Sequence, residues 1–401
     1  MFLSYSKLWV LNKELILSQT FTLIFIFALS LILFSEIIFV SSFLENPALL
    51  VNLIGYLHLT IFLGSFTTLF IIFRNRKKKA DFKKGFSVFG TLIICSIPTL
   101  AYMIPGIAFF FTKNSYFQWI GWVLTLFMLL GFMIGIFYGR WNWKVHRIEL
   151  EFLHLPEDFH EIKLVQISDV HIGSFFDNHE KVKKAILQIN DLQPDYVFFT
   201  GDLVNNTADE IHGWENIFLE IKAKKGKFSI LGNHDYGDYV KWENKAEKEN
   251  NLNKLIQLHR TIGFTPLLNE SVKLTEGFWL LGVENWGKAP FRQSGKLKET
   301  LNNIPEEHFK LLLSHDPSHF DEQVIHTNID LTLSGHTHGM QFGIERFGLK
   351  WSPVSWKYKK WAGLYKEGNQ FLYVNRGFGY IGFPGRVGIY PEITEITLKK
   401  K

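Results

Sequence analysis

The stretch KLVQISDVHIGS, residues 163–174, joins a short apolar run to a pair of metal-ligand side chains. Its first part, 163–168, has the length and apolar content of a buried β-strand. Asp169 and His171 follow directly where that strand should end. Because residues i and i+2 of extended backbone point to the same side, we expect these two side chains to chelate one metal centre.

Four more apolar runs end in the same way. Each is followed at once by residues of metal-ligand type: Gly201-Asp202, Gly232-Asn233-His234-Asp235, Ser314-His315-Asp316 and Gly335-His336-Thr337-His338. The glycines allow the backbone to turn sharply where the strand delivers its polar side chains. The i and i+2 argument again predicts that His336 and His338 bind a single centre.

The order of the elements predicts an α/β domain. We expect strands at 163–168, 196–200, 228–231, 279–283, 310–314, 331–334, 371–375 and 393–398. Stretches with helical spacing lie at 178–190, 210–222 and 238–259. Alternating strands and helices place the loops that follow the strands at one end of a sheet, so the polar clusters should meet there.

The donor types indicate which metals suit such a site. The clusters mix imidazole nitrogens, carboxylates and an amide oxygen, and a carboxylate can bridge two ions. This set suits Mn, Fe or Zn better than Mg or Ca, which favour shells of oxygen alone. The one cysteine, Cys95, lies in an apolar run, so the sequence predicts neither a disulfide framework nor a cysteine-based zinc site.

In order along the chain, the blocks SDVHIG, TGDLV, LGNHDYG, LLSH and LSGHTHG resemble those of the calcineurin-like metallophosphoesterase superfamily, and in particular its membrane-associated group. The resemblance covers about residues 145–398, and we place the domain at 144–401. It implies an αββα fold, in which two sheets form a sandwich between helices. It also implies hydrolysis of phosphate mono- or diesters by two divalent transition-metal ions.

The resemblance assigns a role to each site residue. The first metal would be held by Asp169, His171 and His338. The second would be held by Asn233, His315 and His336, with Asp202 bridging the two ions. A water between the ions would supply the attacking hydroxide. His234 would protonate the leaving oxygen or stabilise the transition state, and Asp235 would orient His234.

Residues 1–143 have a different composition. They carry 11 basic and 4 acidic side chains, whereas the rest of the chain carries 32 and 34. Four uncharged stretches reach the roughly 20 residues that cross a bilayer. We expect a four-helix transmembrane domain with spans at 15–35, 49–73, 86–111 and 116–138. Among their polar groups, Asn52 and His58 lie inside a span and Glu36 lies near an edge, which is too sparse to predict an ion pathway.

The charge of the loops predicts an orientation. Loop 74–84 carries seven basic residues, and the other two loops carry at most one. The positive-inside rule places this loop in the cytoplasm, together with both termini and the phosphoesterase domain. A short linker, roughly 140–155, would keep that domain close to the bilayer. We therefore expect a multi-pass protein of the cell membrane.

These features predict a membrane-anchored phosphoesterase with a binuclear metal centre, and lipid-linked esters are among its candidate substrates. The first alternative is a membrane receptor or transport regulator whose phosphoesterase-like domain only senses a ligand; the complete ligand set argues against it. The second alternative is a nuclease. The slight acidic excess after residue 143 argues against nucleic-acid partners, which attract concentrated Lys and Arg. The sequence leaves the substrate and the oligomeric state open.

Residues 350–366 interleave aromatic and basic side chains. The aromatic members are Trp351, Trp356, Tyr358, Trp361 and Tyr365. Rings mixed with lysines are typical of the lipid headgroup layer, which predicts that this segment docks at the bilayer. Three alternatives are a loop that packs its rings over the core, a lid over the site, and a stacking platform for single-stranded nucleic acid.

Overall fold

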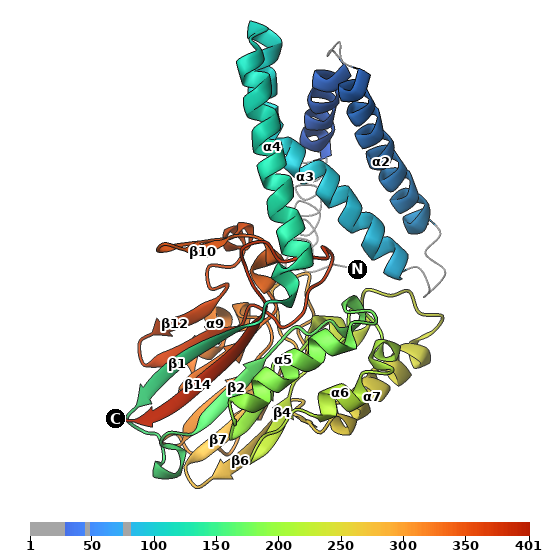
Figure 1. Ribbon diagram of the computed structural model, residues 1–401. Coiled ribbons are helices and arrows are strands. Elements are labelled where there is room, and N and C mark those ends of the chain that lie inside the picture. The colour runs from blue at the N-terminus through green and yellow to red at the C-terminus, as the bar shows by residue number, and fades with distance from the viewer. Residues whose placement is uncertain (1–28, 45–48, 75–81) are drawn as a thin grey trace, which may run out of the picture. The chain divides into compact units, whose positions relative to one another are not determined.

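The computed structural model describes residues 29–44, 49–74 and 82–401 of the chain (Figure 1). The chain divides into two compact units, residues 1–133 and residues 134–401. The boundary expected from the sequence, after Trp143, lies slightly further along. Helix α4 (Ser115–Phe137) runs from the first unit into the second, so its last turn belongs to the second unit.

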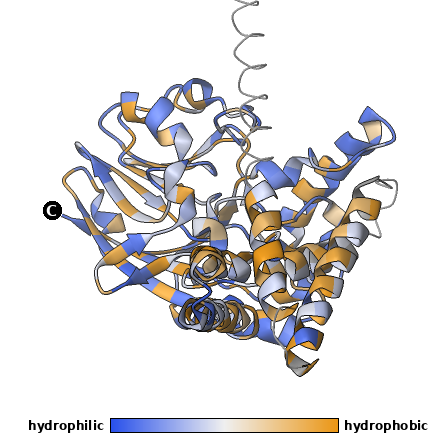
Figure 2. Cartoon of the chain, turned by 90° about the horizontal axis from the view of Figure 1, so that it is seen from above, coloured by the Kyte–Doolittle hydropathy of each residue, from blue (hydrophilic) through white to orange (hydrophobic). Residues whose placement is uncertain are grey.

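The described part of the first unit is helical. It holds a helix at Leu29–Leu44, α2 (Leu49–Arg74), α3 (Phe82–Thr112) and most of α4. Three segments are long and apolar enough to cross a bilayer, namely Val51–Ile71, Ser87–Thr112 and Ser115–Trp141. Figure 2 shows apolar residues along much of these helices. The predicted span at 15–35 and the basic loop at 74–84 lie largely outside the described residues.

A buried tyrosine ring organises the packing of the first unit. Tyr102 on α3 is fully buried, and the ring of Phe39 meets it edge to face with centroids 5.5 Å apart. A Cβ at Gly121 of α4 or at Gly106 of α3 would collide with the Tyr102 ring. Small residues at such contacts let membrane helices approach closely where no hydrophobic force drives them together.

The second unit contains two mixed sheets of six strands each. The first sheet has the order β1-β14-β2-β3-β4-β5. Its strands are β1 (Lys144–Phe152), β2 (Lys163–Ile167), β3 (Tyr196–Phe199), β4 (Gly226–Ser229), β5 (Thr265–Pro266) and β14 (Glu392–Lys400). Strands β2, β3 and β4 are parallel neighbours, whereas β14 runs antiparallel to β2.

The second sheet has the order β12-β13-β9-β8-β7-β6. Its strands are β6 (Glu270–Thr275), β7 (Phe278–Gly282), β8 (Phe309–Leu313), β9 (Leu331–Ser334), β12 (Gly363–Glu367) and β13 (Gln370–Val374). Strands β7, β8, β9 and β13 are parallel. A separate antiparallel hairpin is formed by β10 (Ile344–Arg346) and β11 (Leu349–Trp351).

One hydrophobic core joins the two sheets. Leu164 and Phe198 of the first sheet belong to the same buried cluster as Leu311 and Leu331 of the second. Helices α5 (His179–Asp191), α6 (Glu215–Leu219) and α7 (Lys245–Thr261) lie beside the first sheet in Figure 1. Helices α8 (Leu297–Thr300) and α9 (Ser318–Glu322) contribute to a second cluster with β7, β8 and β13.

Each predicted strand is found close to its expected bounds, but three other expectations need correction. The region 210–222 forms a 3-10 turn and the short α6 instead of one helix. Helix α7 begins at Lys245, later than expected. The predicted linker 140–155 is wrong, because β1 occupies most of it and pairs with β14 along its whole length. The alternation of half-exposed residues in β1 is that of an edge strand rather than of a buried one.

Candidate metal centre

The candidate site lies at the ends of strands from both sheets. In the first sheet, the loops after β2, β3 and β4 deliver four side chains, namely Asp169, His171, Asp202 and Asn233. In the second sheet, the loops after β8 and β9 deliver His315, His336 and His338. Parallel neighbours end at the same edge of a sheet, so the side chains that follow them collect in one place.

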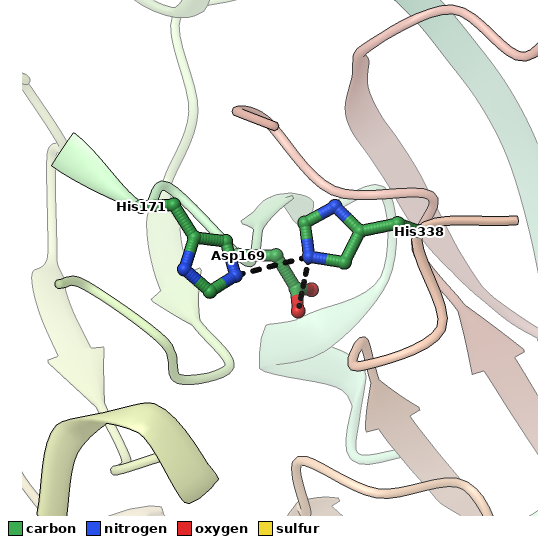
Figure 3. Close-up of side chains that lie close together, drawn as sticks. All are labelled: Asp169, His171 and His338. Atoms are coloured by element: carbon green, nitrogen blue, oxygen red, sulfur yellow. Dashed lines mark hydrogen bonds and ion pairs between the residues drawn. The ribbon is translucent and has the colours of Figure 1, made fainter. Parts of the chain in front are cut away.

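The first group comprises Asp169, His171 and His338, and all three residues are buried. His171 Nε2 lies 3.0 Å from His338 Nε2, and His338 Nε2 lies 3.3 Å from Asp169 Oδ1. Figure 3 shows the two rings and the carboxylate turned toward one another. One potential ligand atom from each residue lies within 4.8 Å of the others, so the group can hold a metal ion.

The second group comprises Asp202, His315 and His336. His315 Nε2 lies 3.1 Å from Asp202 Oδ2. His336 Nδ1 lies 2.8 Å from the amide oxygen of Asn233, which places Asn233 at the edge of this group. Its amide nitrogen donates to the hydroxyl of Tyr239 at 2.7 Å, so Asn233 directs its oxygen toward His336.

Asp202 connects the two groups. Its Oδ2 faces His315 of the second group at 3.1 Å and His171 of the first group at 3.7 Å. Its Oδ1 accepts a hydrogen bond from the backbone nitrogen of His234 at 2.8 Å. One carboxylate oxygen is therefore held by the backbone while the other is shared between the two groups.

Left-handed backbone directs these side chains. Asp169, His171, Asp202, His336 and His338 have φ angles of 52°, 47°, 61°, 73° and 51°. Such conformations are costly for residues other than glycine and collect at functional sites. The prediction that His336 and His338 bind one centre is wrong, because they fall in different groups. That argument assumed extended backbone, which none of the four residues adopts, and Asp169 and His171 share a group all the same.

The orientation of His315 fits a metal ligand. Its Nδ1 donates to the backbone oxygen of Thr200 at 2.7 Å, so in the neutral ring the lone pair lies on Nε2. That Nε2 is buried and has no hydrogen-bond partner among the residues described here, although Asp202 Oδ2 is close. Metal-binding histidines are commonly oriented by such a bond at the other ring nitrogen. The donor set and this nitrogen both fit a divalent metal ion.

The charges of the site residues depend on one another. Burial alone would raise the pKa values of Asp169 and Asp202, but the neighbouring imidazoles hold both well below the ordinary range. Burial lowers the pKa values of His171, His336 and His338, which favours the neutral rings that bind metals. At His315 burial acts in the same direction, but Asp202 and Asp169 outweigh it and raise the pKa to about 10.

The structure assigns Asp235 a contact different from the expected one. Asp235 was expected to orient His234, but its carboxylate accepts hydrogen bonds from backbone nitrogens of Gly232, Asp202 and Leu203 at 2.8 to 2.9 Å. Burial and the nearby charge of Asp202 raise the pKa of Asp235 to about 7. His234 is oriented by another group, since its Nδ1 lies 2.7 Å from the backbone oxygen of Asn205.

Two residues beside the histidines lie outside the motifs: Arg386 was not predicted at all, and Tyr358 was expected only as a member of segment 350–366. The hydroxyl of Tyr358 lies 2.9 Å from His336 Nε2 and donates to Asp316 at 3.3 Å. Arg386 is fully buried, and its Nη2 lies 3.1 Å from His338 Nδ1. Both come from irregular loops, where neither periodicity nor spacing predicts a contact with the site.

The segment 350–366 divides into packed and exposed rings. Tyr358 and Trp361 are buried in a small cluster with Ile389, so the packed-loop interpretation holds for these two rings. Trp351 and Trp356 are exposed, with their ring centroids 6.1 Å apart. The segment is therefore partly a support for the site, through Tyr358, and partly an uncovered surface.

Known proteins resemble this chain in the region of the site. The model of the calcineurin-like phosphoesterase family matches residues 162–340. The uncharacterized metallophosphoesterase YkuE of Bacillus subtilis is 33% identical over 256 residues, which cover 61% of this chain and 82% of that protein. The transmembrane protein with metallophosphoesterase domain of Danio rerio is 29% identical over 272 residues. The aligned region covers 64% of this chain and 57% of that protein.

A third relative has a substrate in its name. The UDP-2,3-diacylglucosamine pyrophosphatase LpxG of Chlamydia trachomatis is 26% identical, over 60% of this chain and 82% of that protein. The matches cover the strand-end blocks that carry Asp169 through His338, and the resemblance seen in those blocks is thereby confirmed. With its two groups of Asp and His side chains that can hold metal ions, the chain belongs to the calcineurin-like phosphoesterase family of metal-dependent phosphoester hydrolases.

Proposed function

We propose that this chain is a membrane-anchored phosphoesterase that hydrolyses phosphate mono- or diesters with two divalent transition-metal ions, Mn, Fe or Zn. The observation that carries the proposal is the pair of buried Asp and His groups that meet at Asp202. Two ions bound there would act as Lewis acids on the phosphoryl oxygens and lower the pKa of a water. The mixture of nitrogen and oxygen donors favours these metals over Mg or Ca.

In this proposal each group holds one ion. The first ion would be held by Asp169, His171 and His338, and the second by Asn233, His315 and His336. Asp202 would serve both groups, because its Oδ2 faces imidazoles of each. The carbonyl of Thr200 and the hydroxyl of Tyr358 support the second group by fixing the rings of His315 and His336.

His234 acts on the leaving oxygen. Its Nδ1 must be a donor, because its partner is the backbone oxygen of Asn205 at 2.7 Å. Nε2 is therefore the nitrogen that can carry a proton for the leaving oxygen. The ring stands edge to face against His171 with centroids 4.9 Å apart, which keeps it beside the first group. Asp235 positions the turn that holds Asp202, and it acts on His234 only through the backbone.

The proposed anchor comprises four transmembrane helices. Three candidate spans lie in the described residues, and the fourth is the predicted span at 15–35. The seven basic residues of loop 74–84 support a cytoplasmic position for that loop, for both termini and for the phosphoesterase domain. Reporter fusions after Lys144 and within this loop should signal cytoplasm, and a fusion near Asn46 should signal the outside. An outside signal after Lys144 would reverse the orientation.

The proposed substrates are phosphoesters linked to lipids. An anchored enzyme meets membrane lipids at a high local concentration, which favours them over dilute soluble esters. The relative LpxG is named for a diacylated substrate, and its sequence aligns with 60% of this chain. The sensing alternative remains distinguishable, because it predicts binding of metal without turnover.

The test uses the purified full chain in detergent, stripped of metal with a chelator. We expect little turnover of p-nitrophenyl phosphate, bis-p-nitrophenyl phosphate or diacylglycerol pyrophosphate before metal is added, and turnover of at least one after Mn²⁺ or Zn²⁺ is restored. Turnover that is equal before and after chelation would contradict a metal-dependent reaction. Two bound metals per chain without turnover of any ester would favour the sensing alternative.

A further inference from the structure

The hairpin β10–β11 exposes apolar side chains that the second unit does not cover. Phe347 at its turn is 97% exposed, and Trp356, shortly beyond it, is 78% exposed. The hairpin also exposes Ile344, Leu349 and Trp351. An uncovered apolar cluster of this kind marks an interaction surface, whereas single exposed apolar residues are ordinary. We call residues 340–356 the apolar hairpin.

The hairpin turns its polar face toward the domain and its apolar face away from it, the reverse of a strand pair on a surface in water. Ile344 pairs with Trp351, and Arg346 pairs with Leu349, so these side chains share one face. Glu345 and its partner Lys350 lie on the opposite face. Polar groups of that face are bound to the domain: Glu345 forms an ion pair with Arg376 at 2.6 and 2.7 Å, and Lys350 donates to the backbone oxygen of Ala362.

This polarity needs a nonaqueous neighbour. In a hairpin on a soluble surface, the apolar face packs on the domain and the polar face meets water. Here the polar face is held against the domain and the apolar face points away from it. A cover must therefore come from outside the described fold of the second unit, and it must accept aromatic and aliphatic side chains.

The base of the hairpin lies beside the residues where the chain leaves its last candidate span. The backbone nitrogen of Gly343 donates to the oxygen of Val387 at 3.0 Å, and the backbone nitrogen of the preceding residue, Arg386, donates to the oxygen of Gly135 at the same distance. Gly135 lies in the last turn of α4, and the candidate span is Ser115–Trp141. These contacts lie within the second unit. If the candidate span crosses a bilayer, as proposed, this base lies close to the point where the chain leaves it.

The exposed charges suit a lipid surface. Arg346, Lys357 and Lys359 are exposed and basic, while Glu345 is turned toward the domain. Lys360, in contrast, is paired with Asp321 and contributes little free charge. Tryptophan rings favour the headgroup layer, and basic side chains are attracted to anionic headgroups.

We propose that the apolar hairpin inserts its tip into the headgroup layer of the bilayer that the chain's own helices span. This inference depends on the proposed membrane anchor, and it specifies how the metal site reaches its substrate. The 3-10 turn His338–Gln341 leads from the first metal group directly into the hairpin, and Met340 within it is 60% exposed. Docking therefore holds the His338 turn at the lipid surface, where phosphoesters of the headgroup layer can reach it.

Site-specific labelling of the full chain tests the docking. In a Cys95→Ser background, a fluorophore on Phe347→Cys is compared with one on Leu187→Cys, an exposed residue of α5, after reconstitution into vesicles of phosphatidylcholine and phosphatidylglycerol. We expect quenching by headgroup-region doxyl lipid and loss of quenching by aqueous iodide at position 347, and the reverse at position 187. Iodide quenching at 347 equal to that at 187 would overturn the proposal, as would quenching between labelled chains without quenching by doxyl lipid.

A matched pair of charge substitutions tests the consequence for turnover. Phe347→Asp should lower turnover of a vesicle-borne lipid phosphoester by about ten-fold, the loss expected for one large apolar side chain, whereas Leu187→Asp should not. Both variants should hydrolyse a soluble nitrophenyl ester at the normal rate. Equal turnover of the lipid ester by both variants would contradict a role for the hairpin. If neither ester is hydrolysed by the unmodified chain while position 347 is lipid-quenched, the docking stands and the proposed function fails.

Discussion

The two units of the chain each bury a polar cluster built from carboxylate and imidazole groups, and the two clusters are satisfied in different ways. In the first unit, His58 Nε2 lies 2.7 Å from Glu36 Oε2, and the hydroxyl of Thr99 donates to Glu36 Oε1 at 2.9 Å. Each oxygen of this carboxylate has its own partner. Glu36 and His58 lie 22 residues apart in sequence, and helix packing brings them together.

In the second unit, more groups converge than can satisfy one another. Asp202 Oδ2 faces the imidazoles of His315 and His171 at 3.1 and 3.7 Å. His171 and His338 direct nitrogens at each other at 3.0 Å, although burial favours the neutral form of both rings. Only one proton fits between these two nitrogens, and Nε2 of His315 is buried without a hydrogen-bond partner among the described residues.

The difference indicates what turns a buried polar cluster into a metal site. A carboxylate whose two oxygens each have a donor is a closed pair that stabilises helix packing. A cluster with inward-facing donor atoms of this kind can hold a cation, and five residues with left-handed φ angles, at the ends of three strands, position its side chains. We therefore expect substitutions in the second cluster to abolish activity, and substitutions in the first to alter only stability.

The largest effect is expected for Asp202→Asn. The substitution removes the charge of the carboxylate shared between the two groups but keeps its size, so the fold should persist. We expect turnover of nitrophenyl esters to fall on the order of 10³-fold, the scale for loss of one transition-state electrostatic group in a buried site. Asp209→Asn, which alters an exposed carboxylate paired with Lys254, is the matched control and should keep full activity. Normal turnover by Asp202→Asn would refute a shared metal ligand.

The next effect is expected for His234→Ala. Because Nε2 of His234 is proposed to protonate the leaving oxygen, the rate should fall by roughly 10²-fold with an alkyl ester, the lower end of the range for general acid catalysis. With nitrophenolate as the leaving group, which needs no proton, the loss should be much smaller. Elemental analysis should find the metal content unchanged. An equal loss with both esters would assign His234 a different role, and loss of metal would make it a ligand.

The sequence predicted the strand-end ligands well because each lies within a few residues of a strongly apolar run. The i and i+2 rule was less useful, because it assumes extended backbone: it united His336 and His338, which lie in different groups, although Asp169 and His171, also with left-handed φ angles, share one. Arg386 and Tyr358 reach the site from irregular loops, and no periodicity in the sequence predicts such contacts. The pair Glu36 and His58 could not be foreseen, since apolar helices carry no pattern that specifies which faces meet.

A pH effect follows from the charge of His315. In the metal-free protein Asp202 and Asp169 raise the pKa of His315 to about 10, so its ring is protonated at neutral pH and must lose that proton to bind a metal. Metal affinity at the second group should therefore rise about ten-fold per pH unit between pH 6 and 8. Calorimetry of Zn²⁺ binding in buffers of different ionisation enthalpy should detect one proton released at this group. A release that does not change in Asp202→Asn would contradict this origin, because that variant loses the charge that holds the proton.

The smallest effect is expected in the first cluster, where Thr99→Val removes the donor to Glu36 Oε1. The loss of one hydrogen bond between membrane helices should destabilise the full chain in detergent by about 1 kcal/mol, measured by thermal unfolding. Thr91→Val on the same helix is the matched control, because the Thr91 hydroxyl donates only to Ser87 of its own turn, and its unfolding should be nearly unchanged. Neither variant should alter turnover of a soluble ester at a temperature where both are folded. A loss of turnover in Thr99→Val but not in Thr91→Val would mean that the Glu36 cluster acts on the metal centre, and the contrast between a closed pair and an open metal site would no longer hold.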